Sequence, residues 1–158
     1  MVNNQKILFK FIQTNKNLNC DDISYKYKLS ENFIKKFQDK FDWDYISMKQ
    51  KLSESFIIEF KNKVSWNWIP MYQKLSESFI IEFQDKLDWD WISYFQKLSE
   101  NFIREFQYEV SWGLISSQQK LSENFIREFQ NKVNWDYISK YQTLSQDFKN
   151  EFKHKTKW

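Results

Sequence analysis

Apolar residues return along this chain in a fixed order and at a fixed interval. A Leu-Ser pair marks the start of each interval and recurs every 23 residues, without insertion or deletion, at positions 29–30, 52–53, 75–76, 98–99, 121–122 and 144–145. A constant internal period of this size is the signature of proteins that grow by stacking one unit on the next. The pattern predicts an all-α fold, an α-solenoid of short helix-turn-helix repeats with a 23-residue period.

Each repeat divides into two amphipathic segments. The first helix should begin at Ser30, whose hydroxyl can accept a hydrogen bond from a backbone N–H of the first turn. Its buried face should hold four apolar residues, Phe33, Ile34, Phe37 and Phe41. The second helix repeats this order, with Asp42 as a possible cap and with Tyr45 and Ile46 on the buried face. Helices of about 9–11 residues are marginal alone, so stability must come from stacking.

The start of the second helix is ambiguous, because good capping residues occupy both the position of Asp42 and the position of Asp44 in the repeats. Pro70 bears on the choice in the repeat 52–74. A proline lacks the N–H that a helix interior needs, but it is tolerated in the first turn. We therefore expect Asn67, and not Ser65, to cap the helix in this repeat.

One long helix or coiled coil is the rival architecture, and it accounts better for the near absence of glycine at helix ends. Three apolar turns in each half repeat correspond to about 3.8 residues per turn, so the apolar stripe would drift around a straight helix. The recurring Ser and Asp caps would also lie inside a helix, where they are mildly unfavourable. Broken helices are the better prediction.

Three segments follow from this register. Residues 1–17 depart from it, and the spacing of Leu8, Phe11 and Ile12 predicts a divergent N-terminal capping helix. The repeat array covers residues 18–143, with a half repeat at 18–28 and full repeats at 29–51, 52–74, 75–97, 98–120 and 121–143. Residues 144–158 form a C-terminal partial repeat, in which the polar Lys149 and Thr156 replace apolar residues and should end the stack.

Composition narrows the class of protein. Aromatic residues make up 20% of the chain, so the core should be built largely from rings. The net charge of +3 is too small to indicate a nucleic-acid or membrane partner. The single Cys20 excludes an intramolecular disulfide and fits a reducing compartment. No apolar run approaches the roughly 20 residues of a membrane span. We expect a soluble intracellular protein.

Residues for catalysis are scarce. His154 is the one histidine, and Cys20 has no histidine near it in the sequence. The pairs Asp42/Asp44 and Asp88/Asp90 have the chemistry of acid–base carboxylates, but their recurrence at helix starts indicates capping. Neither a metal-ligand cluster nor a glycine-rich phosphate loop is present in the sequence. We predict a protein that is not an enzyme and uses no cofactor.

Constant and variable positions suggest different roles. One tryptophan recurs in each repeat, as Trp43, Trp66, Trp89, Trp112, Trp135 and Trp158. Exposed rings at this interval could stack the bases of single-stranded nucleic acid. A residue that is the same in every repeat is, however, what stacking of the repeats requires. We therefore favour one shared niche between helices for these rings.

The variable positions in the middle of the second helix are the candidate partner-binding residues, and neutral drift at solvated sites is the alternative. They are Met48, Lys49, Met71, Tyr72, Tyr94, Phe95, Ser117, Gln118, Lys140 and Tyr141, between a constant Ile and a nearly constant Gln. On the first helix, Ile58 and Ile81 either widen the core or form an exposed apolar patch.

The repeat 98–120 departs most from its siblings, through Tyr108, Glu109, Gly113, Leu114, Ser117 and Gln118. Four other repeats carry a Glu–Lys pair four residues apart on the first helix, which is weakly stabilising. These pairs are Glu59–Lys63, Glu82–Lys86, Glu128–Lys132 and Glu151–Lys155. The repeat 98–120 has the like-charge pair Glu105–Glu109 instead. It is either a binding spot or a relaxed repeat, and relaxation is the preferred interpretation.

The phrase KLSENFIREFQ…KVNWDYISKYQ resembles the tandem 23-residue repeats of proteins from mimivirus-like giant DNA viruses of amoebae. The resemblance covers residues 18–158, through the elements LSE-x-FI-x-EF and W-x-x-IS-x-x-Q. It implies a viral helical repeat protein in the host cytoplasm and supplies no activity.

The leading functional hypothesis is a non-enzymatic helical repeat scaffold that mediates protein–protein interaction in a virus-infected cell. Its partner would be a protein whose identity the sequence does not reveal. One alternative is single-stranded nucleic-acid binding through the Trp residues and lysines. The other is a purely structural repeat protein that self-associates.

Overall fold

The computed structural model describes residues 2–14 and 20–158, with side chains except at positions 2–6, 11 and 21. Within this part, all regular structure is helical, in thirteen α-helices and one 3-10 helix, which confirms the all-α repeat fold. Three predicted features lie outside it: residues 1 and 15–17 of the capping helix, residues 18 and 19 of the half repeat, and the Phe11 side chain.

Two helices alternate along the repeats, as predicted. The first helices are α3 (Glu31–Lys36), α5 (Glu54–Glu59), α7 (Glu77–Glu82), α9 (Glu100–Glu105), α11 (Glu123–Glu128) and α13 (Gln146–Glu151). The second helices are α2 (Asp21–Lys26), α4 (Trp43–Lys49), α6 (Ile69–Tyr72), α8 (Trp89–Phe95), α10 (Trp112–Gln118) and α12 (Trp135–Tyr141). The chain begins with α1 (Val2–Thr14), and a 3-10 turn follows α7 at Gln84–Lys86.

The helices of the repeats, from α2 to α13, have 4–7 residues and are shorter than the predicted 9–11 residues. The first helix of the repeat 29–51 ends at Lys36, and Phe37 closes it by donating its N–H to the carbonyls of Phe33 and Ile34. A turn then leads to the second helix, with the Lys40 N–H donating to the Phe37 carbonyl at 2.9 Å. The apolar periodicity continues through this turn, so the spacing of apolar residues does not reveal the break between the helices.

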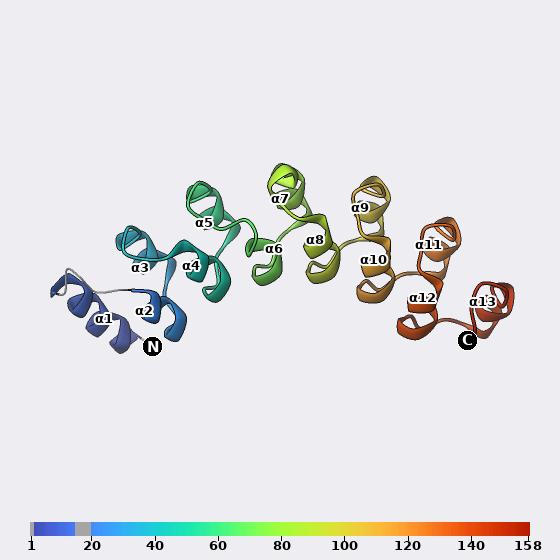
Figure 1. The fold of residues 1–158 in the computed structure, drawn as a ribbon, viewed down its shortest axis with the longest axis horizontal. Coiled ribbons are helices and arrows are strands. Elements are labelled where there is room, and N and C mark those ends of the chain that lie inside the picture. Colours follow the sequence, from blue (N-terminus) through green and yellow to red (C-terminus); the bar gives the residue numbers. More distant parts are fainter. Residues whose placement is uncertain (1, 15–19) are drawn as a thin grey trace. The chain divides into compact units, whose positions relative to one another are not determined.

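The chain forms two compact halves, an N-terminal half up to Leu75 and a C-terminal half from Ser76. Within each half, the first helices form one layer and the second helices another (Figure 1). Neighbouring second helices contact each other: α4 lies against α2 and α6, and α10 lies against α8 and α12. Each repeat thus packs on its neighbours within its half.

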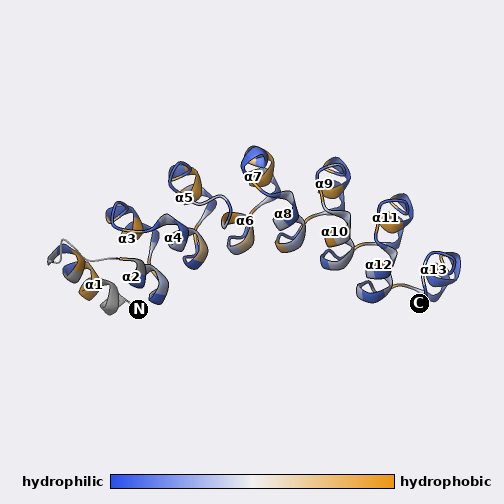
Figure 2. Cartoon of the chain, in the orientation of Figure 1, coloured by the Kyte–Doolittle hydropathy of each residue, from blue (hydrophilic) through white to orange (hydrophobic). Residues whose placement is uncertain are grey.

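The core contains two isoleucines per repeat, together with buried Phe, Leu and Val side chains. Ten of these isoleucines are at most 1% exposed: Ile34, Ile57, Ile80, Ile103 and Ile126 on first helices, and Ile46, Ile69, Ile92, Ile115 and Ile138 on second helices. Figure 2 shows the hydrophobic sides of α7 and α9 turned toward the second-helix layer. Burying one such side chain stabilises the fold by about 1.5–3 kcal/mol, so the isoleucines are a principal source of repeat stability.

Serine caps every first helix from α3 to α13. The hydroxyl of each capping Ser accepts a hydrogen bond from the N–H three residues later, at 3.1–3.3 Å, as predicted for Ser30. The capping serines are Ser30, Ser53, Ser76, Ser99, Ser122 and Ser145.

The structure decides between the two possible capping positions of the second helix, those of Asp42 and Asp44. Asp42 and Asp88 accept hydrogen bonds from backbone N–H groups of the first turn, and so does Asn134. In the repeat 52–74 the helix begins only at Ile69, with Trp68 before it and no side-chain cap. The prediction that Asn67 caps this helix is therefore wrong. Pro70 does lie in the first turn, where its missing N–H is tolerated.

The helices at the two ends of the chain, α1 and α13, also bury or pack aromatic side chains. In α1, the Phe9 ring meets the Phe37 ring edge-on at 5.3 Å, and the Lys36 ammonium lies 4.3 Å from the centre of the Phe9 ring. In α13, Phe148 is fully buried, whereas Lys149 is only half-buried. None of the helices in the described residues is both long and apolar enough to cross a membrane.

Candidate functional site

A buried glutamine at the end of the second helix ties neighbouring repeats together. The side-chain oxygen of Gln119 accepts a hydrogen bond from the Leu98 N–H at 3.1 Å. Its amide group donates to the carbonyls of Ser93 at 3.1 Å and Gln96 at 2.8 Å. The same three bonds recur at Gln50, Gln73 and Gln142. Both the oxygen and the NH₂ group of this side-chain amide therefore hold neighbouring repeats together.

A buried serine on the second helix also joins neighbouring repeats, because it binds the backbone at the start of the next second helix. The hydroxyl oxygens of Ser47, Ser93 and Ser116 accept hydrogen bonds from the backbone N–H 18 residues later, at 2.9–3.0 Å. All three are fully buried. Pro70 occupies this position in the repeat 52–74, so that repeat lacks the hydroxyl.

The glutamate after the Leu-Ser pair contacts the following repeat. The carboxylates of Glu31, Glu77, Glu100 and Glu123 accept the N–H of the capping serine 22 residues later, at 2.5–2.6 Å. The backbone and side-chain hydrogen bonds from Ser145 lower the pKa of Glu123, with a smaller contribution from the Arg127 charge. The carboxylate is thus held in its ionised form by the next repeat.

Four of the recurring tryptophans fill one shared niche between repeats, whereas Trp158 is 39% exposed and meets Trp135 and Phe148 edge-on. Trp43, Trp89, Trp112 and Trp135 each lie against two phenylalanine rings of the next repeat, with ring centres 4.8–6.4 Å apart. The indole N–H of Trp112 donates to the Gln107 carbonyl, and Trp43, Trp66 and Trp135 make the equivalent bond. These rings are half-buried. Protein side chains thus cover part of each ring.

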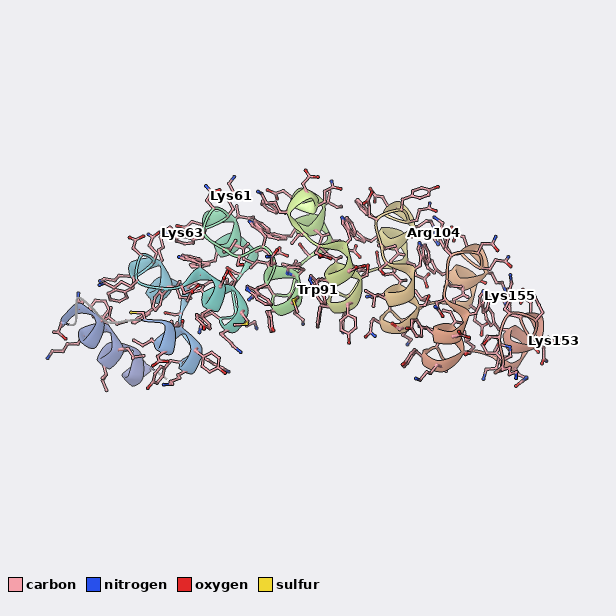
Figure 3. The ribbon with its side chains drawn as sticks, in the orientation of Figure 1. Lys61, Lys63, Trp91, Arg104, Lys153 and Lys155 are labelled. Carbon is pink, nitrogen blue, oxygen red and sulfur yellow. The ribbon has the colours of Figure 1, made fainter. Side chains whose placement is uncertain are left out.

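Ion pairs on the first helices also join repeats. Lys35 pairs with Glu59, Arg104 with Glu128 at 2.8 Å, and Arg127 with Glu151 at 2.9 Å, always 24 residues apart. Figure 3 shows Arg104 reaching from α9 toward the neighbouring first helix. Its hydrogen bonds lower the pKa of Glu128, and that carboxylate raises the pKa of Arg104.

The predicted pairing of Glu59, Glu128 and Glu151 with lysines four residues later is therefore wrong. The first helices end at these glutamates, so each lysine falls in the following turn and off the helix face. Lys63 instead pairs with Asp39 at 2.7 Å, and Lys132 donates to the Gln107 side chain at 2.8 Å. These lysines therefore find their partners in a neighbouring repeat and not four residues away on the same helix.

Ile58 and Ile81 occupy the position that Lys35, Arg104 and Arg127 hold in other repeats. Their side chains are 39% and 41% exposed. The structure thus places each isoleucine at the surface of its own half, where the ion-pair series is interrupted, and this exposure argues against the wider core.

In the N-terminal half, the candidate partner-binding residues lie on α4 and α6. Lys49 and Tyr72 are exposed, whereas Met48 and Met71 are half-buried. The Tyr72 ring packs on Trp68 at 6.0 Å. The Lys49 ammonium lies 4.8 Å from the centre of the Tyr25 ring on α2.

In the C-terminal half, exposed rings gather on the second helices. We call five of them the aromatic surface: Trp91, Tyr94 and Phe95 on α8, and Tyr137 and Tyr141 on α12, each 38–51% exposed. The rings pair within each helix, with Trp91 and Phe95 5.8 Å apart and Tyr137 and Tyr141 5.9 Å apart. Lys140 lies over the Tyr141 ring at 5.1 Å. Figure 3 labels Trp91 on this layer.

Trp91 and Tyr137 were not among the predicted binding residues. Sequence reasoning assigned their position to the buried face, because the equivalent Tyr45 precedes the buried Ile46. The structure corrects this, since the position is half-buried at Tyr45 and exposed at Trp91 and Tyr137. The available signal was variability: this position changes between Tyr, Trp and Leu, whereas the isoleucine beside it is constant.

A groove interrupts the aromatic rings at α10, which lies between α8 and α12. Ser117 and Gln118 stand there in place of the rings of Tyr94 and Phe95. The groove has a volume of about 290 Å³, and its lining is Ser117, Gln118, Gln119, Lys120, Leu121, Tyr141, Gln142 and Thr143. Three candidate partner-binding residues, Ser117, Gln118 and Tyr141, therefore meet at one concave site.

The described residues contain no group of three or more His, Cys, Asp or Glu side chains able to hold a metal ion. Cys20 is fully buried at the start of α2. No protein family, characterised protein or solved structure matches the chain.

Proposed function

We propose that this protein is a non-enzymatic helical repeat scaffold that binds another protein through the exposed side chains of its second helices. One observation carries the proposal. The constant Gln, Ser, Glu, Trp and Ile residues are engaged in repeat stacking, whereas Tyr94, Phe95 and Tyr141 vary between repeats and are 42–51% exposed. Aromatic rings are enriched at protein interfaces, where a few anchors supply most of the binding free energy.

The energetic argument favours a partner for these rings. An exposed ring leaves apolar area in contact with water. Burial of that area by a partner lowers the free energy by about 25 cal/mol per Å². The rings of α8 are also held in place by one another, with Tyr94 and Phe95 4.6 Å apart. Such mutual packing lowers the rotamer entropy that is lost on binding.

The test is partner capture by the immobilised protein, followed by mass spectrometry. Replacing Tyr94, Phe95 and Tyr141 together by serine should reduce capture of the specific partner more than about tenfold, since interface anchors contribute about 2 kcal/mol or more each. The helicity measured by circular dichroism should stay native, because none of the three residues is buried.

Tyr108→Ser is the matched control, because Tyr108 is 85% exposed but lies in the turn after α9, away from the second helices. This variant should capture the partner as the wild type does. Equal capture by the triple variant with native helicity would refute the proposal.

The place of action that we propose is the cytoplasm of an infected host cell, on the resemblance of the repeats alone. Single-stranded nucleic acid and self-association stay alternative hypotheses. Because the tryptophans already stack on phenylalanine rings, a nucleic acid would have to use the exposed rings and lysines instead. Quenching of tryptophan fluorescence by oligothymidylate at low salt tests the first alternative, and light scattering across protein concentration tests the second.

A further inference from the structure

The groove at α10 is formed by side chains that fold back onto their own helix. The Ser117 hydroxyl donates to the Leu114 carbonyl at 3.1 Å, and the Gln118 amide donates to the Ser117 hydroxyl at 3.2 Å. Both side chains are therefore held against α10, and neither fills the space that the rings of Tyr94 and Phe95 take on α8. The departure of the repeat 98–120 from its siblings thus has a structural result, the groove beside Tyr141.

The lining of the groove carries positive charge only. Lys120 is the one charged residue of its lining. The Lys120 side chain is exposed, and no carboxylate among the described residues lies within 4.0 Å of its ammonium. The acidic residues of these second helices, Asp88, Asp90 and Asp136, lie at the opposite, N-terminal helix ends. An anionic group entering the groove meets a cation and no facing carboxylate from its lining.

The size and polarity of the groove limit its occupant. A volume of about 290 Å³ is at the lower end of the roughly 300–1,000 Å³ of ligand pockets, so it suits one or two side chains rather than a cofactor. The lining offers the Gln118 amide, the Thr143 hydroxyl and the Lys120 ammonium next to the Tyr141 ring. An acidic side chain beside an apolar one matches this combination.

We infer that the groove binds an extended acidic segment of the partner protein, with an Asp or Glu carboxylate against Lys120 and the apolar residue next to it on the Tyr141 ring. The inference rests on the proposed function and deepens it, because it gives the chemistry of the partner. Charge complementarity decides between occupants: a basic segment would face Lys120 without compensation, and like charges in contact are unfavourable.

The probe is a set of three synthetic peptides, acetyl-Gly-Leu-X-Leu-Gly-amide, with Glu, Gln or Lys at X. Binding is followed by two-dimensional NMR of the ¹⁵N-labelled full chain. The Glu peptide should shift the amide signals of residues 117–121 and 140–143. It should bind about fivefold more tightly than the Gln peptide, as a partly exposed ion pair supplies up to about 1 kcal/mol. The Lys peptide should bind most weakly.

Three variants test whether the peptides bind in the groove. Lys120→Glu should reverse the order of the Glu and Lys peptides. Lys97→Glu makes the same charge change at the equivalent position one repeat earlier, where Phe95 stands in place of Gln118, and should leave all affinities within about twofold of wild type. Ser117→Tyr, which introduces the residue found at position 94, should fill the groove and abolish the shifts while helicity stays native.

Several results would overturn the inference. They are no shift by any peptide in the wild type, equal affinity of the three peptides, equal effects of Lys120→Glu and Lys97→Glu, or shifts of residues 117–121 by oligothymidylate but not by the Glu peptide. If these occur while the triple variant of the aromatic residues still loses partner capture, the proposed function stands without the acidic segment. If that variant retains capture, the proposed function itself fails.

Discussion

The glutamine that follows α4, α6, α10 and α12 joins neighbouring repeats through three hydrogen bonds of one side chain. Gln119 is 7% exposed and bonds to three backbone groups, on Ser93, Gln96 and Leu98. Its length lets it cross from one repeat to the loop of another, and its amide offers a donor and an acceptor together. A buried glutamate would lack the donor, and a leucine would leave three backbone groups unsatisfied.

Gln119→Ala should therefore lower the free energy of unfolding by about 2–4 kcal/mol, because each hydrogen bond contributes roughly 1 kcal/mol and orphaned buried groups add a desolvation penalty. Urea unfolding followed by circular dichroism measures this change. Gln118→Ala is the control: Gln118 is exposed, and its change should stay within about 0.5 kcal/mol. Similar losses in both variants would contradict the role of Gln119.

At the scale of the element, α10 has the weakest start among the second helices of the C-terminal half. Asp88 of α8 and Asn134 of α12 accept hydrogen bonds from their first turns. Ser111 of α10 makes no such bond, although its backbone conformation is also extended. Gly113 follows in the first turn, and an added Cβ there would meet the Tyr137 ring at an ordinary 3.8 Å. The backbone conformation therefore requires neither serine at position 111 nor glycine at position 113.

Ser111→Asp should stabilise the protein by about 0.5–1 kcal/mol, because a cap carboxylate accepts an otherwise unpaired N–H and interacts favourably with the helix dipole. Thermal unfolding by calorimetry, compared at one pH, measures the gain. Ser117→Asp places the same charge near the other end of α10 and should not stabilise the protein. Destabilisation by Ser111→Asp would show that this helix start differs from those of its siblings.

At the scale of the whole molecule, the hydrogen bonds between neighbouring repeats recur at offsets of 18, 21, 22 and 24 residues in each half. Stability in such a chain is approximately a sum over repeats and their interfaces. Residues 98–107 and 121–130 are identical, LSENFIREFQ, so removal of residues 98–120 would recreate the same sequence after Lys97.

The chain without residues 98–120 should keep its helical fold, with a urea m value lower by roughly one seventh, in proportion to the surface lost. Removal of residues 98–114 is the control, because it breaks the register and should unfold the helices that follow. Circular dichroism and urea titration compare the two. Equal loss of helicity in both would mean that the repeats are not interchangeable.

The sequence alone determined the period, the all-α class, the serine caps of the first helices and the buried isoleucines. These features repeat, and each depends on local spacing that a single repeat already contains. The constant tryptophans were also recognised as packing residues for this reason. The alternatives at the second-helix cap stayed open because Asp42 and Asp44 both have capping chemistry.

Only the tertiary structure decided the pairing between repeats. The partners of Gln119, Glu123 and Arg104 lie 21–26 residues away, and sequence spacing within one helix cannot identify a partner at that distance. The lengths of the helices, the exposure of Trp91 and the groove at Ser117 depend in the same way on where the chain turns and on what faces it. The candidate binding surface therefore emerged from contacts between repeats.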